Sequence, residues 1–332
     1  MITRRPLFPI IALLLTAAVA CGGDDSFPKN DTSKARPGGV NKVESVVKTP
    51  VGSGADAVGT DVPEEGNPEG PASFAVDAQG QVFILDQVNA RIQIFAGGKH
   101  IGTIALPDVT YDDIELDGAG GYILLDKSER EAVLFLNKDG VETSSIRIAG
   151  GPIAAPGDVT GLYRTNDGIW LEVDDAALVQ IADAAGNPVQ TRVEDQGRRD
   201  RDGRTVLAAI DGDRDVVLTA RAQGAAESAE IGRISFASTV AHISAFEYDD
   251  DGNVLIGVET FVEGTEAQDF EVQSINHEVV TVNRAGAEIR RDNLLAKDDP
   301  LTQFRYVRRG GDGKLYQLKV GDSGAEVVRY VP

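Results

Sequence analysis

A repeat of about forty residues constrains the fold of this chain more than any other feature of its sequence. Residues 74–86 and 114–126 align without a gap, and each has an apolar stretch, an Asp/Gly turn and a second apolar stretch that ends in Asp. The aligned pairs are Asp77/Asp117, Gly80/Gly120, Asp86/Asp126 and, farther along, Phe95/Phe135. Short apolar stretches on either side of such turns predict β-hairpins, so each unit is expected to be an antiparallel meander.

The pattern recurs four more times, although less regularly. The later turns lie at residues 166–168, 211–214, 249–253 and 310–313, each between two apolar stretches. In the fourth unit, this pattern makes residues 207–210 the first strand and 216–218 the second. Six units of roughly forty residues match the length of a four-stranded propeller blade. The sequence therefore predicts an all-β fold, a six-bladed β-propeller of four-stranded antiparallel blades.

The sixth unit offers only three strands, which indicates how the ring closes. Residues 40–51 contain several valines and form an isolated candidate strand upstream of the first unit. A propeller whose first and last blades were not joined would expose a sheet edge. We therefore expect this N-terminal strand to complete the last blade, so that the propeller domain spans residues 40–332.

One motif of the first unit carries a family resemblance. Its pattern is Asp77-x-x-Gly80-x-x-x-x-x-Asp86-x-x-Asn89-x-Arg91-Ile92-x-x-Phe95. This pattern resembles an NHL repeat of the six-bladed, TolB-like propeller group, most closely over residues 70–107 and less over 111–148, where glutamates replace Asn89 and Arg91. Propellers of this kind include protein-binding scaffolds, RNA binders and a few lyases or lactonases. The resemblance thus implies an architecture and leaves the activity open.

The N-terminal segment has the pattern of a bacterial export signal. Arg4 and Arg5 precede an apolar run that stops at Cys21, the only cysteine, and the run is shorter than the ~20 residues of a membrane-spanning helix. Residues 18–21, Ala-Val-Ala-Cys, resemble the lipobox of bacterial lipoproteins, whose cysteine is acylated and becomes the first residue of the mature protein. The alternative is an ordinary secretory signal with an unrelated cysteine.

From this resemblance we expect residues 1–20 to be a lipoprotein signal peptide and Cys21 to be the lipidation site. Residues 21–39 are rich in Gly, Asp, Ser, Pro and Lys, with one large apolar residue, so we expect a disordered tether. The modification supplies several acyl chains, and two or more chains anchor a protein stably. The expected location is the bacterial cell envelope, with a membrane attachment through the lipid and the domain outside the cytoplasm.

The charge balance excludes one class of partner. The chain has 32 basic and 53 acidic residues, and removing Arg4 and Arg5 with the signal changes the net charge from −21 to −23. Nucleic acids and anionic lipid headgroups attract Lys/Arg patches and are repelled by such a surface. We therefore expect no nucleic-acid binding.

The residues that commonly carry catalysis are sparse. The three histidines, His100, His242 and His277, lie in different units without metal-ligand spacing, and only His242 is expected near the axis. Nucleophile-elbow, phosphate-loop and dinucleotide motifs are missing from the sequence. The aspartates at 211–215 and 249–251 have partial calcium-loop spacing but are more simply hairpin turns. We expect no catalytic residue, no metal site and no cofactor.

Two charged segments have alternative interpretations. Residues 196–204 alternate in charge and indicate a solvated loop between the third and fourth units. Arg305, Arg308 and Arg309 lie on or just after the strand expected to line the axis in the sixth unit. They either hold an anion in the channel or pair with carboxylates from other blades, and the acidic excess favours pairing.

The fifth unit departs from the repeat through an insertion at residues 259–275. Insertions in repeats map to loops on one face and are often where binding occurs. An acidic hairpin with exposed aromatic residues can dock a basic partner; the alternative is a solvated hairpin whose aromatic residues fold back on the blade. The candidate partner-binding residues are Phe261, Glu263, Glu266, Asp269, Phe270 and Glu271.

These features favour a membrane-anchored propeller lipoprotein that acts as a binding or scaffold module for an envelope protein or a ligand. The alternative is a propeller hydrolase or lyase that uses channel carboxylates and a divalent metal. The scarcity of histidine favours the binding module over the enzyme.

Overall fold

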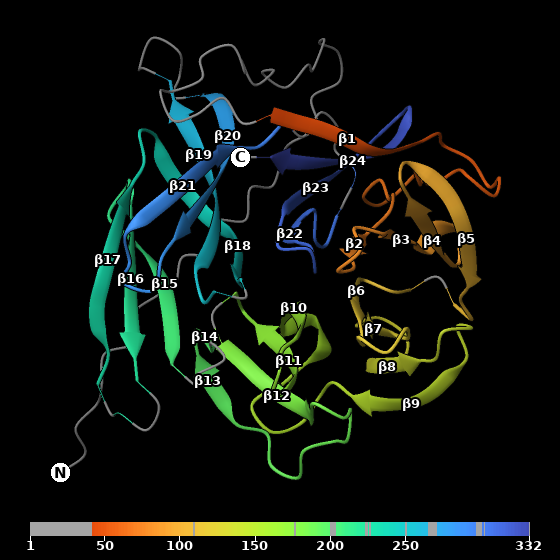
Figure 1. The fold of residues 1–332 in the computed structure, drawn as a ribbon, viewed down its shortest axis with the longest axis horizontal. Coiled ribbons are helices and arrows are strands. Elements are labelled where there is room, and N and C mark those ends of the chain that lie inside the picture. The colour runs from red at the N-terminus through yellow and green to blue at the C-terminus, as the bar shows by residue number, and fades with distance from the viewer. Residues whose placement is uncertain are drawn as a thin grey trace.

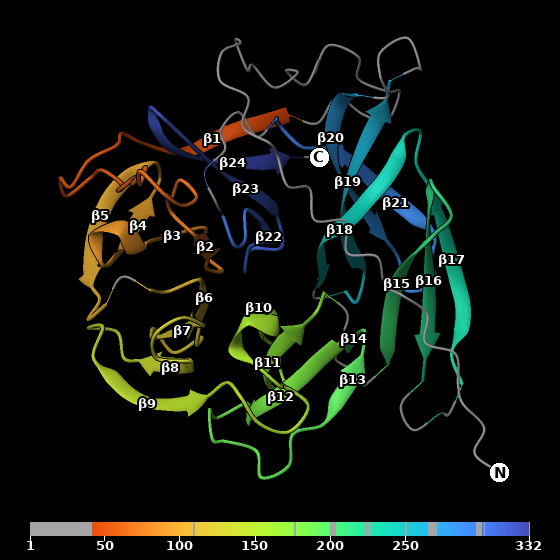
Figure 2. The same cartoon turned by 180° about the vertical axis from the view of Figure 1, so that it is seen from behind.

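The computed structural model describes residues 42–331, apart from 109, 176, 200–203, 223–224, 226, 250, 265–270, 297–300 and 302. The described residues form six four-stranded antiparallel sheets arranged in a ring (Figures 1 and 2). This arrangement confirms the predicted all-β, six-bladed propeller. Helix in the described part is restricted to two single-turn 3-10 segments, η1 (Gln87–Asn89) and η2 (Pro156–Asp158).

In blades one to five, the strands follow one another in chain order within each sheet. The strands of blades one and two are β2 (Ser73–Val76), β3 (Val82–Asp86), β4 (Arg91–Ala96), β5 (Lys99–Ala105), β6 (Asp113–Leu116), β7 (Tyr122–Asp126), β8 (Ala132–Leu136) and β9 (Glu142–Arg147). Those of blades three and four are β10 (Val159–Arg164), β11 (Gly168–Val173), β12 (Ala177–Asp183), β13 (Glu194–Gln196), β14 (Arg198–Arg199), β15 (Thr205–Asp211), β16 (Asp215–Arg221) and β17 (Ala229–Ser235). Blades five and six contain β18 (Thr239–Tyr248), β19 (Val254–Glu263), β20 (Val272–Val282), β21 (Glu288–Asn293), β22 (Val307–Arg309), β23 (Leu315–Gly321), β24 (Gly324–Val331) and β1 (Lys42–Thr49).

The sixth blade is closed by the N-terminal strand, as predicted. β1 is its outer strand and pairs antiparallel with β24, from Lys42 opposite Val331 to Thr49 opposite Ala325 (Figure 1). Val47 of β1 is 2% exposed and belongs to the apolar cluster that packs blade six against blade one. The strand thus contributes both backbone pairing and core packing.

Apolar side chains pack between neighbouring blades. Five clusters of buried residues join blades one and two, two and three, four and five, five and six, and six and one. Among the described residues, none of these five clusters joins blades three and four. Charged side chains link these two blades: Asp195 of β13 lies 2.6 Å from both Arg199 of β14 and Arg221 of β16, and its carboxylate accepts a 3.2 Å hydrogen bond from Thr205.

The fourth blade corrects two sequence predictions. Its innermost strand is β14, which pairs with β15, so residues 207–210 belong to the second strand. The segment 196–204 is not simply a solvated loop, because Arg198 within it is 5% exposed. Arg198 is buried because it has charged partners in the interior. A pattern of apolar residues does not reveal a buried position that a charged residue occupies.

The predicted signal peptide, Cys21 and the tether lie outside the described residues, so lipidation and the domain boundaries stay predictions. Within the part of the chain that is described, no helix is long and apolar enough to cross a membrane.

Candidate functional site

Two cavities lie near the axis of the ring. The larger, of about 920 Å³, is lined by the turns that link the first and second strands of several blades, which places it toward one face. The smaller, of about 350 Å³, is lined by the other ends of these strands, including Thr160 of β10 and His242 of β18, and by the connection that leads into β22. The walls of both cavities contain Tyr163, Leu178, Arg198 and Phe246.

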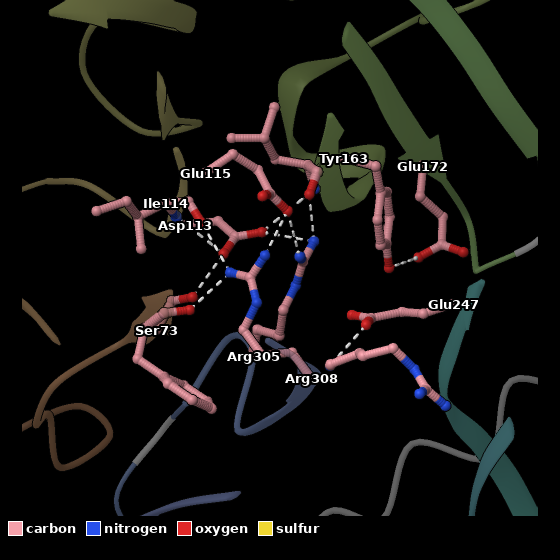
Figure 3. Close-up of polar contacts among 12 residues, drawn as sticks. Ser73, Asp113, Ile114, Glu115, Tyr163, Glu172, Glu247, Arg305 and Arg308 are labelled. Carbon is pink, nitrogen blue, oxygen red and sulfur yellow. Dashed lines mark hydrogen bonds and ion pairs between the residues drawn. The ribbon is translucent and has the colours of Figure 1, made fainter. Parts of the chain in front are cut away.

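A buried ion-pair network lies beside these cavities (Figure 3). Arg305, just before β22, lies 2.9 Å from Asp113 and 2.8 Å from Glu115, and Arg308 of β22 lies 2.7 Å from Glu115. Asp113 is fully buried and also accepts a 2.6 Å hydrogen bond from the hydroxyl of Ser73. The network therefore ties the innermost strands of blades one and two to blade six.

Tyr163 extends this network toward blade four. The guanidinium carbon of Arg198 lies 3.6 Å from the centroid of its ring, and that of Arg305 lies 4.3 Å away. The Tyr163 hydroxyl donates to Glu172 at 3.3 Å (Figure 3). Glu172 also accepts a 2.6 Å hydrogen bond from Arg198 of blade four. Arginine over an aromatic face is favourable, and more so away from water, so these contacts hold both cations in place.

The structure decides between the two interpretations of the arginines in the sixth unit. Arg305 and Arg308 pair with carboxylates of blade two, as the acidic composition favoured. Arg309 also contacts carboxylates: its backbone N–H donates to Glu247 at 2.8 Å, and its guanidinium lies 3.6 Å from Asp249. The charges near the axis are therefore used mainly in structural pairs.

The prediction that only His242 lies near the axis is wrong, because His242 and His277 both line the smaller cavity. The Nδ1 atom of His277 lies 3.0 Å from the Tyr306 hydroxyl and 3.6 Å from a carboxylate oxygen of Glu259. His277 reaches this position because its strand, β20, is long and extends beyond the outer strand β21. His100, by contrast, bonds Gln93 within blade one. The described residues contain no group of three or more His, Cys, Asp or Glu side chains arranged to hold a metal ion.

The turn aspartates have structural partners. Asp249 accepts hydrogen bonds from two backbone N–H groups of its own turn, in agreement with the hairpin interpretation. Asp211 and Asp215 lie opposite each other at the hairpin turn between β15 and β16, as predicted, and form ion pairs with Arg233 at 2.6 and 3.3 Å. The carboxylates of Asp211, Asp215 and Asp249 therefore bind protein groups.

The aspartates that end second strands bond neighbouring groups in blades one and two. Asp86 accepts from the backbone of Gly59 and pairs with Arg91 at 2.7 Å. Asp126 accepts three hydrogen bonds from the backbone that follows it. Asp174 does not follow this pattern, because its carboxylate makes no hydrogen bond to another described residue and its backbone turns with a φ of 52°.

The predicted insertion is largely an extension of two strands. β19 and β20 remain paired as far as Glu263 opposite Val272, whereas β18 pairs with β19 only as far as Phe261. Residues 261–263 and 271–275, called the blade-five ribbon below, therefore lie at or beyond the end of the four-stranded sheet. Three apolar side chains of this ribbon are exposed: Val262 at 40%, Val272 at 45% and Ile275 at 38%.

The candidate partner-binding residues lie partly in this ribbon. Phe261 is half-buried, and Glu263 and Glu271 are exposed. Glu266, Asp269 and Phe270 lie outside the described residues. The exposed valines and isoleucine were not predicted from the sequence, because a hairpin pattern alone does not show where the neighbouring strands stop.

Sequence reasoning also missed Asp113, Glu115, Tyr163 and Glu172. A signal existed for the first two: acidic residues flank Ile114 in the innermost strand of the second repeat, where apolar residues dominate. Carboxylates at such positions require buried cations nearby. The arginines of the sixth unit supply these cations.

Comparison with known proteins finds only distant structural neighbours. No family model matches the chain, and no curated protein matches its sequence. A member of the DUF4221 family from Bacteroides vulgatus is 11% identical, with a TM-score of 0.46 over 88% of this chain and 98% of that chain. Virginiamycin B lyase from Staphylococcus aureus is 10% identical, with a TM-score of 0.41 over 79% and 94%. BamB from Moraxella catarrhalis is 14% identical, with a TM-score of 0.36 over 79% and 83%.

Proposed function

We propose that this chain is a lipid-anchored binding protein of the bacterial cell envelope, and that the blade-five ribbon docks a partner protein with a basic surface. The observation that carries the proposal is the ribbon itself. It combines exposed apolar side chains with acidic ones, Glu263 and Glu271, at the end of an otherwise regular sheet. Acidic groups steer a basic surface, and the apolar groups then lose water on contact.

The backbone of the ribbon supports the same role. The outer strand β21 pairs with β20 only from Glu278 onward, and the N–H of Leu294 bonds the His277 carbonyl, so β20 extends past its outer neighbour from Val272 to Asn276. Proteins commonly recognise partners by adding a strand at an edge that extends in this way. Full burial of a valine contributes roughly 1.5–3 kcal/mol, so two or three apolar contacts would add appreciably to binding.

The axial network supports a scaffold more than a catalyst. Asp113, Glu115 and Glu172 are each bonded to arginine, so these channel carboxylates lend no specific support to the alternative of a hydrolase or lyase. A cross-blade network of this kind resists opening of the ring and keeps the ribbon in a fixed position. A ribbon that is already rigid loses less conformational entropy when it binds a partner.

The test places a photo-crosslinking amino acid at Val272 in the full chain produced in its own cells. Ile289 is the matched control, because it is also an exposed apolar residue of blade five, at 54% exposure, and lies on β21 away from the ribbon. We expect one defined protein adduct from position 272 and none from position 289. The adduct should decrease as salt rises from about 0.05 to 0.5 M, because screening weakens charge steering.

A second variant removes the ribbon without cutting the blade. Phe261 and Ile275 lie opposite each other in the register, so an Asn-Gly turn can join them and replace residues 262–274. This variant should retain the β-sheet circular dichroism of the parent and lose the adduct formed by a crosslinker moved to Ile275. Equal crosslinking from positions 272 and 289, or an adduct that survives ribbon removal, would contradict the proposal.

A further inference from the structure

The larger cavity contains one positive charge that the described residues do not balance. The arginines in its wall are Arg164, Arg198, Arg199, Arg308 and Arg309. All of them except Arg164 lie between 2.6 and 3.6 Å from a carboxylate oxygen. Arg164, the last residue of β10, is exposed, and its side chain forms no ion pair or hydrogen bond with another described residue. Its guanidinium is therefore available to an anion from outside the chain.

The carboxylates of the same wall already have other partners among the described residues. Backbone N–H groups donate hydrogen bonds to Asp77, Glu247 and Asp249. Glu115 accepts hydrogen bonds from two arginines, and Asp167 accepts one from an indole N–H. The cavity thus retains an unpaired arginine although the chain has a net charge of −21.

A glycine of blade two determines where the guanidinium of Arg164 lies. A Cβ atom added at Gly118 would lie 3.0 Å from the Nη2 atom of Arg164 and 3.2 Å from its Nη1 atom. The guanidinium therefore packs directly on the turn between β6 and β7, which also lines the cavity. Gly118 has a φ of 76°, which favours glycine, and a side chain at this position would displace the guanidinium. Packing thus fixes the cation while its charge stays unused.

Apolar side chains lie on both sides of the same turn. Leu116 and Tyr122 are opposite each other in the register of β6 and β7, and both line the cavity. Phe83 of blade one packs on Tyr122 with ring centroids 6.0 Å apart, whereas Leu116 is only half-buried. The volume of about 920 Å³ lies within the roughly 300–1,000 Å³ typical of small-molecule sites. A ligand that uses both features has one anionic group and an apolar body.

We propose that the larger cavity binds a small amphipathic monocarboxylate, either an arylalkanoate or a short fatty acid. The planar guanidinium of Arg164 donates two parallel hydrogen bonds to the carboxylate, and the apolar body packs on Leu116 and its neighbours. A single negative charge fits better than the dianion of a phosphate monoester, because Asp167 and Glu247 in the same wall repel added negative charge. This site goes beyond the proposed function and does not depend on it, because its residues are separate from the blade-five ribbon.

The first test is calorimetric titration of the full chain, purified in detergent, with titrations into detergent alone subtracted. The acids are 4-phenylbutyrate and octanoate, which share the carboxylate and differ in the apolar body. In the comparison probes, 4-phenylbutan-1-ol lacks the charge, 4-phenylbutan-1-amine reverses it, 4-phenylbutyl phosphate adds a second charge and acetate lacks the apolar body. We expect at least one acid to bind at least tenfold more tightly than all four comparison probes. The tighter acid identifies the source as aromatic or aliphatic.

The second test replaces the arginine. Arg164→Gln removes the charge and should weaken binding of the tighter acid at least tenfold. Arg147→Gln is the matched control and should bind like the parent chain. Arg147 is also an exposed arginine at the end of a strand, β9 of blade two, and it lies outside the cavity. Because the side chain of Arg164 bonds no other described residue, we expect its replacement to leave the melting temperature unchanged.

Four outcomes would overturn the proposal. If neither acid binds, the unpaired arginine does not mark a site. If an acid binds no more tightly than its alcohol or acetate, the cavity does not recognise the combination of charge and apolar body. Tighter binding of the phosphate would contradict the preference for one charge. Equal binding of the acid to the parent chain and to Arg164→Gln would mean that the acid is held elsewhere.

Discussion

Replacing Arg305 by methionine should destabilise the propeller strongly, because it leaves a buried carboxylate without its cation. In the native structure, Arg305 lies 2.9 Å from Asp113, which is fully buried, and 2.8 Å from Glu115. Glu115 keeps Arg308 as a partner at 2.7 Å, so Asp113 bears most of the loss. Methionine has a similar length and fills much of the space, which limits the contribution of a cavity.

The size of the effect follows from the contacts that remain. Removing one member of a buried ion pair costs about 3–5 kcal/mol. Asp113 keeps hydrogen bonds from the Ser73 hydroxyl and from the backbone N–H groups of Ile114 and Leu162. These three donors stabilise the carboxylate, so we expect a loss near the lower end, about 3 kcal/mol in the free energy of unfolding.

The loss should depend on pH. Burial raises the pKa of Asp113, and Arg305 is the largest influence that lowers it, so the substitution raises this pKa further. A carboxyl group with a raised pKa binds more protons in the native state than in the unfolded state. Its contribution to stability therefore falls as the pH rises from its unfolded pKa, near 4, toward its native pKa. The deficit of Arg305→Met should be smaller at pH 5 than at pH 8.

Urea unfolding followed by tryptophan fluorescence measures this directly, because Trp170 is the only tryptophan and is buried in blade three. The double variant Arg305→Met/Asp113→Asn removes both charges and should recover at least half of the loss. If Arg305→Met unfolds within about 1 kcal/mol of the parent, or if its deficit is the same at pH 5 and pH 8, then the network does not stabilise the fold as argued here.

Three further predictions concern the anchor, the ring closure and a buried acid. Cys21→Ser should release the protein from the membrane fraction and leave its β-sheet circular dichroism intact; a variant that stays bound to the membrane contradicts lipidation. Deleting residues 40–51 should lower the melting temperature far more than deleting 22–39, because only the first deletion removes β1 and Val47 from the sixth blade; equal melting temperatures rule out this role. Burial raises the pKa of Asp112 to about 6, so Asp112→Asn should stabilise the fold by about 2 kcal/mol at pH 7 and by little at pH 4, as urea titrations at the two pH values will show.

The architecture was predictable because it follows from a sequence repeat of about forty residues. Asp/Gly turns between apolar strands recur at the length of a blade, and the missing strand of the sixth unit indicated that residues 40–51 close the ring. The innermost strand of blade four was not predictable in this way. It consists of Arg198 and Arg199, and its stability comes from Glu172, Tyr163 and Asp195 on another blade.

The candidate sites were predictable only in part. The position of Arg305 and Arg308 on the axis-lining strand followed from the repeat, and the acidic composition favoured carboxylate partners. Which carboxylates these are depends on how the blades meet, so Asp113 could not be assigned from the sequence. His277 lies in a third strand, where the repeat places residues away from the axis, and only the length of β20 brings it to the cavity.

The seam between blades three and four has a consequence for how the ring opens. Concentrated salt weakens ion pairs, whereas kosmotropic salts strengthen apolar packing. The contacts of Asp195 with Arg199 and Arg221 therefore respond to sulfate in the opposite sense to the five apolar clusters. Since a ring needs only one break to become an open solenoid, ionic conditions change the balance between this charged seam and the apolar ones.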